Sequence, residues 1–126
     1  MQKQVNKTVV AVVSDLFFSA KINEAAKRAG IAVEYVTEEK AVMERAKTLP
    51  TLIILDLNFE AAHPLRLITK LKASAELKHI SLIGYLSHVQ GELKQKAQES
   101  GCDMVMPRSA FSLNLAQILK RHAGTV

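Results

Sequence analysis

Tryptophan is absent from this 126-residue sequence, and aromatic residues make up only 5% of it. So small a supply of aromatic rings argues against a surface that stacks on nucleic-acid bases. The single cysteine, Cys102, excludes an internal disulfide and a thiolate zinc site. No apolar run approaches the roughly 18 residues of a membrane span, and the polar start lacks the pattern of a secretion signal. These absences predict a soluble, cytoplasmic protein.

Charge of both signs is present, with lysine and arginine in excess. Seventeen Lys and Arg against twelve Asp and Glu give a formal net charge of +5. A surplus of this sign attracts nucleic acid or acidic proteins. The basic residues are scattered through helical patterns, however, so nucleic acid is not the expected partner. The length and the 48% hydrophobic content predict one globular domain over residues 1–126.

Five apolar runs alternate with amphipathic segments along the chain. The predicted strands are Thr8–Ser14, Ile31–Val36, Leu52–Leu57, Ile80–Leu86 and Cys102–Met106. The predicted helices are Phe17–Ala29, a helix with a capped start at Thr37 that runs through Ala46, a helix that opens at Pro64 and carries Leu71, and the helices Glu92–Ser100 and Leu113–Arg121. Strict alternation predicts an α/β fold with three layers, a parallel sheet between helices. Five units of this length fit the flavodoxin-like strand order 2-1-3-4-5.

Polar residues follow three of the predicted strands. Asp15 closes the first strand and Asp56 the third, and these two strands flank the switch point of the predicted order. Two neighbouring carboxylates favour a divalent cation such as Mg²⁺ between them. Arg108 follows the fifth strand and brings a positive charge to the same rim. Polar residues at strand ends without any function are the competing interpretation.

Three segments carry a resemblance to a known family. They are Leu52–Asn58 (LIILDLN), Val12–Asp15 (VVSD) and Gly101–Arg108 (GCDMVMPR). In their order and spacing they are similar to the motifs of response-regulator receiver domains, the CheY-like superfamily. The resemblance covers nearly every predicted element. It implies a receiver-like domain over residues 1–126 with no output domain.

The resemblance assigns roles to individual residues. It makes Asp56 the phosphoacceptor, and it makes Asp15, Asp56 and the backbone carbonyl of Asn58 the ligands of a magnesium ion. Arg108 takes the place of the family's lysine. Arg108 is then expected either to bind the phosphoryl group or to form a permanent bridge to Asp56.

The sequence also departs from the family pattern. Ser14 replaces the first of two expected acids, which lowers the negative charge of the pocket and predicts weak or absent Mg²⁺ binding. Leu86 aligns with the Thr or Ser that binds the phosphoryl group. Ser87, one residue later, takes that role only if the backbone shifts. Together these changes are typical of an atypical, pseudo-receiver-like domain.

The resemblance predicts a function in two-component phosphorelay signalling through protein–protein contact, and no enzyme. The expected partner is a histidine kinase or a downstream target, and a second copy of the chain is also considered. The partner surface is predicted to include Tyr85, Ser87, His88, Lys94 and Lys96, with His88 as a pH- or ligand-sensitive contact. Two alternatives stay open: a phosphorylation-independent pseudo-receiver, and a small-ligand or metal-binding module.

Overall fold

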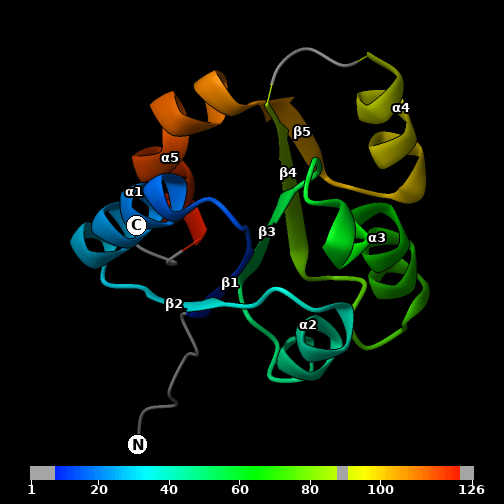
Figure 1. The fold of residues 1–126 in the computed structure, drawn as a ribbon. Coiled ribbons are helices and arrows are strands. Elements are labelled where there is room, and N and C mark those ends of the chain that lie inside the picture. The colour runs from blue at the N-terminus through cyan, green and yellow to red at the C-terminus, as the bar shows by residue number, and fades with distance from the viewer. Residues whose placement is uncertain (1–7, 88–90, 123–126) are drawn as a thin grey trace, which may run out of the picture.

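A parallel five-stranded sheet runs through the middle of the molecule, between two layers of helices (Figure 1). The structure is a computed structural model that describes residues 8–87 and 91–122. The strands are β1 (Thr8–Val12), β2 (Ala32–Tyr35), β3 (Leu52–Asp56), β4 (Ser81–Leu86) and β5 (Met104–Pro107). They pair in the order β2-β1-β3-β4-β5, so the predicted flavodoxin-like topology is confirmed.

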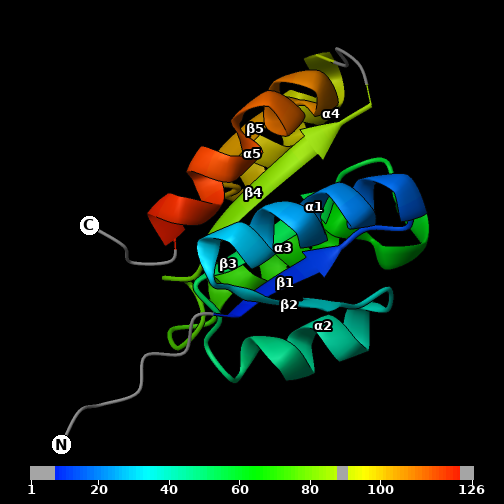
Figure 2. The same ribbon diagram turned by 90° about the vertical axis from the view of Figure 1, so that its left-hand side faces the viewer.

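The helices divide between the two faces of the sheet (Figures 1 and 2). One face is covered by α1 (Leu16–Ala29) and α5 (Arg108–His122). The other is covered by α2 (Glu39–Ala46), α3 (Pro64–Ala73) and α4 (Gly91–Ser100), and a short 3₁₀ turn, η1 (Glu60–Ala62), precedes α3. Across the described ranges, no helix is long and apolar enough to cross a membrane.

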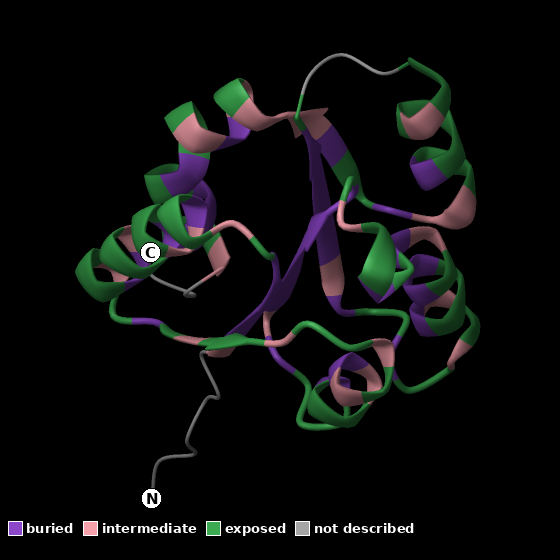
Figure 3. Ribbon diagram, in the orientation of Figure 1, coloured by how far each residue is buried: buried purple, intermediate pink, exposed green. Residues whose placement is uncertain are grey.

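Strand β3 is buried along its whole length (Figure 3). Because successive side chains of a strand alternate between faces, Ile53 and Leu55 pack toward α2 and α3, whereas Leu52 and Ile54 pack toward α1 and α5. The same alternation directs Asp56 to the α1–α5 face. Five consecutive buried positions are typical of a central strand in a parallel sheet that helices cover on both sides.

Three predicted boundaries are wrong. Strand β5 starts at Met104 rather than Cys102, because the Cys102 N–H bonds to the Ala97 carbonyl at the end of α4. Helix α5 starts at Arg108 rather than Leu113, where Phe111 anchors its first turn in the core. The capped start at Thr37 is not formed: Glu38 is the N-cap residue of α2 and makes no side-chain cap bond.

The remaining boundaries agree within one or two residues, and two end signals are confirmed. Gly30 ends α1 in the left-handed conformation (φ 72°), and its N–H bonds to the Ala26 and Lys27 carbonyls. Pro64 is the first residue of α3, where its missing N–H costs nothing.

A glycine in β4 sets a steric limit next to the site. A Cβ atom on Gly84 would lie 2.9 Å from the Cδ1 atom of Leu57, a buried side chain that directly follows Asp56. We expect Gly84→Ala to lower the free energy of unfolding by about 1–3 kcal/mol, because overpacking a dense core forces its neighbours to move. Urea unfolding followed by circular dichroism measures this. Gly91→Ala, where nothing lies within 4 Å, is the control, and equal losses in both variants would contradict the prediction.

Candidate functional site

Asp15 stands at the junction between β1 and α1 and is the N-cap residue of α1. Its backbone is extended (φ −82°, ψ 117°), and its Oδ1 accepts hydrogen bonds from the N–H groups of Phe17 at 2.9 Å and Phe18 at 3.4 Å. Aspartate is favoured here because its short carboxylate satisfies backbone donors that the helix leaves without partners. One of the two carboxylate oxygens is thus used by the fold itself.

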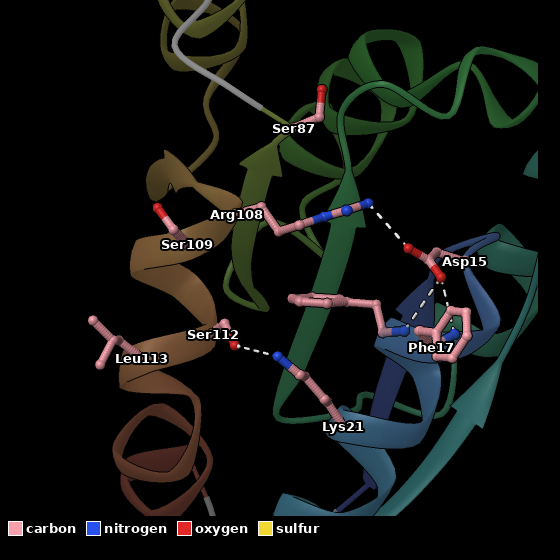
Figure 4. Close-up of a pocket in the computed structure, with 9 residues that line it drawn as sticks. Asp15, Phe17, Lys21, Ser87, Arg108, Ser109, Ser112 and Leu113 are labelled. Atoms are coloured by element: carbon pink, nitrogen blue, oxygen red, sulfur yellow. Dashed lines mark hydrogen bonds and ion pairs between the residues drawn. The ribbon is translucent and has the colours of Figure 1, made fainter.

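The other oxygen of Asp15 pairs with Arg108. Arg108 begins α5 and reaches across to α1, where its Nη2 lies 3.2 Å from Asp15 Oδ2 (Figure 4). Its guanidinium carbon lies 5.3 Å from the ring centre of Phe18 and 6.0 Å from that of Tyr85. Among the described residues, Arg108 forms its ion pair with Asp15 and not with Asp56. The predicted bridge from Arg108 to Asp56 is therefore wrong.

Asp56 ends β3 and is 7% exposed. Its Oδ1 accepts a hydrogen bond of 2.9 Å from the Asn58 N–H. Burial raises the pKa of Asp56 above its ordinary value, and the charge of Asp15 adds to this, whereas the Asn58 N–H and the charge of Arg108 lower it. The raising effects prevail, so Asp56 holds its proton more tightly than an exposed aspartate does.

Asn58 connects the ends of β3 and β4. Its side-chain Oδ1 accepts a hydrogen bond of 2.7 Å from the Ser87 N–H, and its backbone carbonyl accepts one of 3.0 Å from the Glu60 N–H. Ser87 lines the same hollow as Asp15 and Arg108, although its hydroxyl points away from Arg108 (Figure 4). Leu86 packs into the core on the opposite face. Ser87 therefore lines the hollow, and its predicted role in binding a phosphoryl group stays a prediction.

Tyr85 is the site residue that sequence analysis misplaces. The sequence predicts it on a partner surface, but it is fully buried. Tyr85 is the register partner of Asp56 and packs on the α1–α5 face, stacked on Phe111 at 5.2 Å and tilted against Phe18 at 4.8 Å. Burial raises the pKa of its hydroxyl, with a further contribution from the charge of Asp56. The register that pairs Tyr85 with Asp56 comes from the structure, and the sequence pattern carries no signal for it.

An open hollow of about 740 Å³ lies over these side chains, between the starts of α1 and α5. Lys21 spans it, and its Nζ donates to Ser112 Oγ at 3.2 Å (Figure 4). Phe18 is buried beneath the hollow, whereas Phe17 is exposed at its edge. Leu113 lies exposed on the α5 side. Sequence analysis does not foresee this apolar rim.

The oxygen donors suit a hard divalent cation, and Arg108 competes with it. Asp15, Asp56 and the Asn58 carbonyl supply the ligand type that Mg²⁺ prefers. The Arg108 guanidinium, however, already neutralises the Asp15 carboxylate. Among the described residues, no group of three or more His, Cys, Asp or Glu side chains is placed to hold a metal ion, so the site offers the right ligand type but no preformed cluster.

Other predicted residues lie apart from this hollow. Lys94 and Lys96 lie on α4, where Lys96 pairs with Glu92 at 3.7 Å. His88 lies outside the described residues, so its predicted role as a pH- or ligand-sensitive contact stays a prediction.

Solved structures of similar shape are response regulators. One from Hahella chejuensis has a TM-score of 0.82 at 20% identity and covers 95% of this chain and 96% of its own. The phosphorylated cyanobacterial phytochrome response regulator RcpA has a TM-score of 0.74 at 20% identity, covering 93% and 91%. The Mn²⁺-bound response regulator Rcp1 has a TM-score of 0.74 at 18% identity, covering 95% and 96%. Comparison with known families and with curated proteins gives no match. The resemblance to CheY-like receiver domains is thus confirmed at the level of fold.

Removing Arg108 should strengthen cation binding. In Arg108→Ala, the Asp15 carboxylate loses its positive partner, and we expect the affinity for Mn²⁺ or Mg²⁺ to rise about tenfold or more. Isothermal titration calorimetry measures the affinity. Lys21→Ala removes a charge of the same sign from the same hollow without touching Asp15, so its affinity should change less. An equal rise in both variants would show that general repulsion, rather than competition for Asp15, controls the ion.

The raised pKa of Asp56 predicts a pH-dependent stability. A carboxyl group with a raised folded-state pKa stabilises the fold below its ordinary pKa of 3.8, and this contribution is lost as the pH rises through the folded-state value. An asparagine side chain cannot ionise, so we expect Asp56→Asn to stabilise the protein more at about pH 7 than at about pH 3. Urea unfolding at both pH values measures the difference. A gain that is the same at both would contradict the raised pKa.

Proposed function

We propose that this chain is an atypical response-regulator receiver domain that signals through protein–protein contact, with Asp56 as its phosphoacceptor. One observation carries the proposal. Asp56 is the only buried charged side chain in the part of the chain that the structure describes. It stands at the carboxyl end of β3, beside β1, where open α/β sheets bind their ligands. Burying an acid is costly to the fold, and an acid that is buried at a ligand-binding position is therefore a candidate for chemistry.

The proposed reaction is a direct phosphoryl transfer. A carboxylate oxygen of Asp56 forms a new bond to the phosphorus atom of the donor, and the bond between phosphorus and the leaving group breaks. The leaving group departs with the electron pair of that bond. The donor is a phosphohistidine of a kinase or a small acyl phosphate. The ionised form of Asp56 is the nucleophile, and the positive charge of Arg108 lowers the pKa of Asp56 and so favours that form.

A divalent cation would be held by Asp15, Asp56 and the Asn58 carbonyl. It would supply positive charge against the oxygens of the incoming phosphoryl group. The chain itself contributes part of this charge through Arg108. Precedents with the same fold support both features, since one similar structure is a phosphorylated response regulator and another is a Mn²⁺-bound form.

The proposed partner surface is the edge formed by the end of β4 and helix α4. Ser87, Lys94 and Lys96 lie there, and the two lysines suit an acidic surface on a histidine kinase or a downstream target. Tyr85 is excluded from this surface because it is buried. Phosphorylation of Asp56 would affect this edge through Asn58. The Asn58 N–H donates to Asp56 Oδ1, and the Asn58 side chain accepts from the Ser87 N–H.

A second candidate is a pseudo-receiver that signals without phosphorylation. The Asp15–Arg108 ion pair favours it, because this pair occupies the carboxylate that a metal-assisted transfer would use. In such a protein the hollow between α1 and α5 would bind a small ligand or a partner segment directly.

Intact mass after incubation with acetyl phosphate and Mg²⁺ separates the two candidates. We expect the wild-type protein to gain one phosphoryl group and Asp56→Asn to gain none, because the amide is not a nucleophile. Asp103→Asn is the matched control: Asp103 pairs with Lys72 at 3.0 Å, away from the site, and this variant should still be modified. A wild-type protein that stays unmodified at every donor and metal concentration would reject the phosphoacceptor and favour the pseudo-receiver.

A further inference from the structure

Two buried donors lie beside the candidate phosphoacceptor without a partner. They are the Tyr85 hydroxyl and the Arg108 Nε, and among the described residues no other buried side-chain nitrogen or oxygen lacks a hydrogen-bond partner. We call them the Tyr85–Arg108 donor pair. Buried donors are satisfied in nearly all proteins, because leaving one unbonded costs its full desolvation energy. Two such donors in one place indicate a binding position for an acceptor.

The donor pair lies close to the end of β3. The guanidinium carbon of Arg108 lies 6.0 Å from the ring centre of Tyr85, and Tyr85 is the register partner of Asp56 on the neighbouring strand. The hydroxyl of Tyr85 interacts electrostatically with Asp56, Arg108 and Asp15. An acceptor attached to Asp56, or resting beside it, would therefore lie among these groups.

The charges around the donor pair favour an anion. Arg108 begins α5, a helix of 15 residues with no acidic residue in its first turn, so the positive end of the helix dipole is not offset by its own side chains. Lys21 adds a second cation to the hollow. Asp15 and Asp56 supply negative charge, and Arg108 offsets that of Asp15 directly through the ion pair.

The resemblance already suggests Arg108 for the phosphoryl group; we propose that the Tyr85 hydroxyl joins the Arg108 Nε in binding oxygen atoms of a phosphoryl group at Asp56. In its covalent form this inference rests on the proposed function, since Asp56 must carry the group. A free phosphate ion in the same position would offer the same oxygen atoms, so the ligand is either a phosphoryl group attached to Asp56 or a free phosphate ion. No bond is made or broken by the donor pair, which only donates hydrogen bonds.

The geometry favours Tyr85 over Ser87 for this role. The Ser87 hydroxyl points away from Arg108 (Figure 4), whereas the Tyr85 hydroxyl is buried on the face that carries Asp56. The ring of Tyr85 is held between Phe18 and Phe111, so its hydroxyl is positioned before any ligand arrives. Of the two donors, Arg108 lines the hollow, with its side chain 38% exposed, whereas Tyr85 lies beneath it, so the phosphoryl group would approach from the Arg108 side.

Tyr85→Phe tests the inference, because it keeps the ring and removes only the hydroxyl. After acetyl phosphate is removed, we expect the phosphoryl group to be lost about tenfold faster from Tyr85→Phe than from the wild type, since a hydrogen bond to a charged group is missing. Decay of the phosphorylated mass measures the rate. Tyr35→Phe is the control, because Tyr35 donates to the Ser19 carbonyl outside the site.

A second measurement tests the binding of free phosphate and shows whether the Tyr85 hydroxyl has only a structural role. The chain has no tryptophan and two tyrosines, so in Tyr35→Phe the tyrosine emission reports Tyr85 alone. Titration of Tyr35→Phe with inorganic phosphate should change this emission, and calorimetry on Tyr85→Phe should give an affinity about tenfold lower than the wild type. The melting temperature of Tyr85→Phe should stay unchanged or rise, because the hydroxyl it loses had no partner.

The outcomes separate the inference from the proposed function. Faster decay in Tyr85→Phe alone supports the covalent source. A wild-type protein that is never phosphorylated, but binds phosphate through Tyr85, rejects the proposed function and supports the free ion. If Tyr85→Phe equals the wild type in both decay and phosphate affinity, the inference is overturned. It is overturned as well if the only change is a lower melting temperature.

Discussion

The arrangement of this site depends on the two oxygens of one carboxylate. Asp15 satisfies the first turn of α1 with Oδ1 and pairs with Arg108, the first residue of α5, with Oδ2. These two contacts join the two helices that cover one face of the sheet, and they determine where the hollow between the helices opens. A residue that is a metal ligand by resemblance is therefore also a structural element of this fold. Any ion that binds Asp15 must displace a contact between α1 and α5.

Ser14 and Arg108 both limit the negative charge of the rim. Ser14 removes one acid from the rim, and Arg108 places a delocalised cation against one of the two acids that remain. In a partly buried site a carboxylate is stabilised by a fixed partner of opposite charge. Arg108 supplies that partner within the chain, and the aromatic faces of Phe18 and Tyr85 stabilise it in turn. With fewer acids and an internal cation, the pocket attracts a metal ion less than three carboxylates would.

The topology could be predicted from the sequence, whereas the contacts at the site could not. Apolar runs bounded by Gly30 and Pro64 mark elements whose order admits few topologies, and parallel strands necessarily bring Asp15, Asp56 and Arg108 to one rim. The partner of Arg108 depends on the conformation of a long side chain, about which spacing carries no information. The surface position predicted for Tyr85 is wrong because the pattern around β4 does not show which of its residues share a face with Asp56. Strand register decides this, and a shift of one residue reverses the answer.

The aromatic layer beneath the hollow limits how a change at Asp56 can spread through the molecule. The Tyr85 ring is clamped between Phe18 of α1 and Phe111 of α5 in a densely packed core, so it cannot swing outward as an isolated side chain. A displacement of the Tyr85 ring would instead displace Phe18 and Phe111, and with them both helices. Shear, in which packed layers slide past one another by small amounts, is the kind of movement that this packing permits. In such a movement α1 and α5 would change position together, as one unit, relative to the sheet.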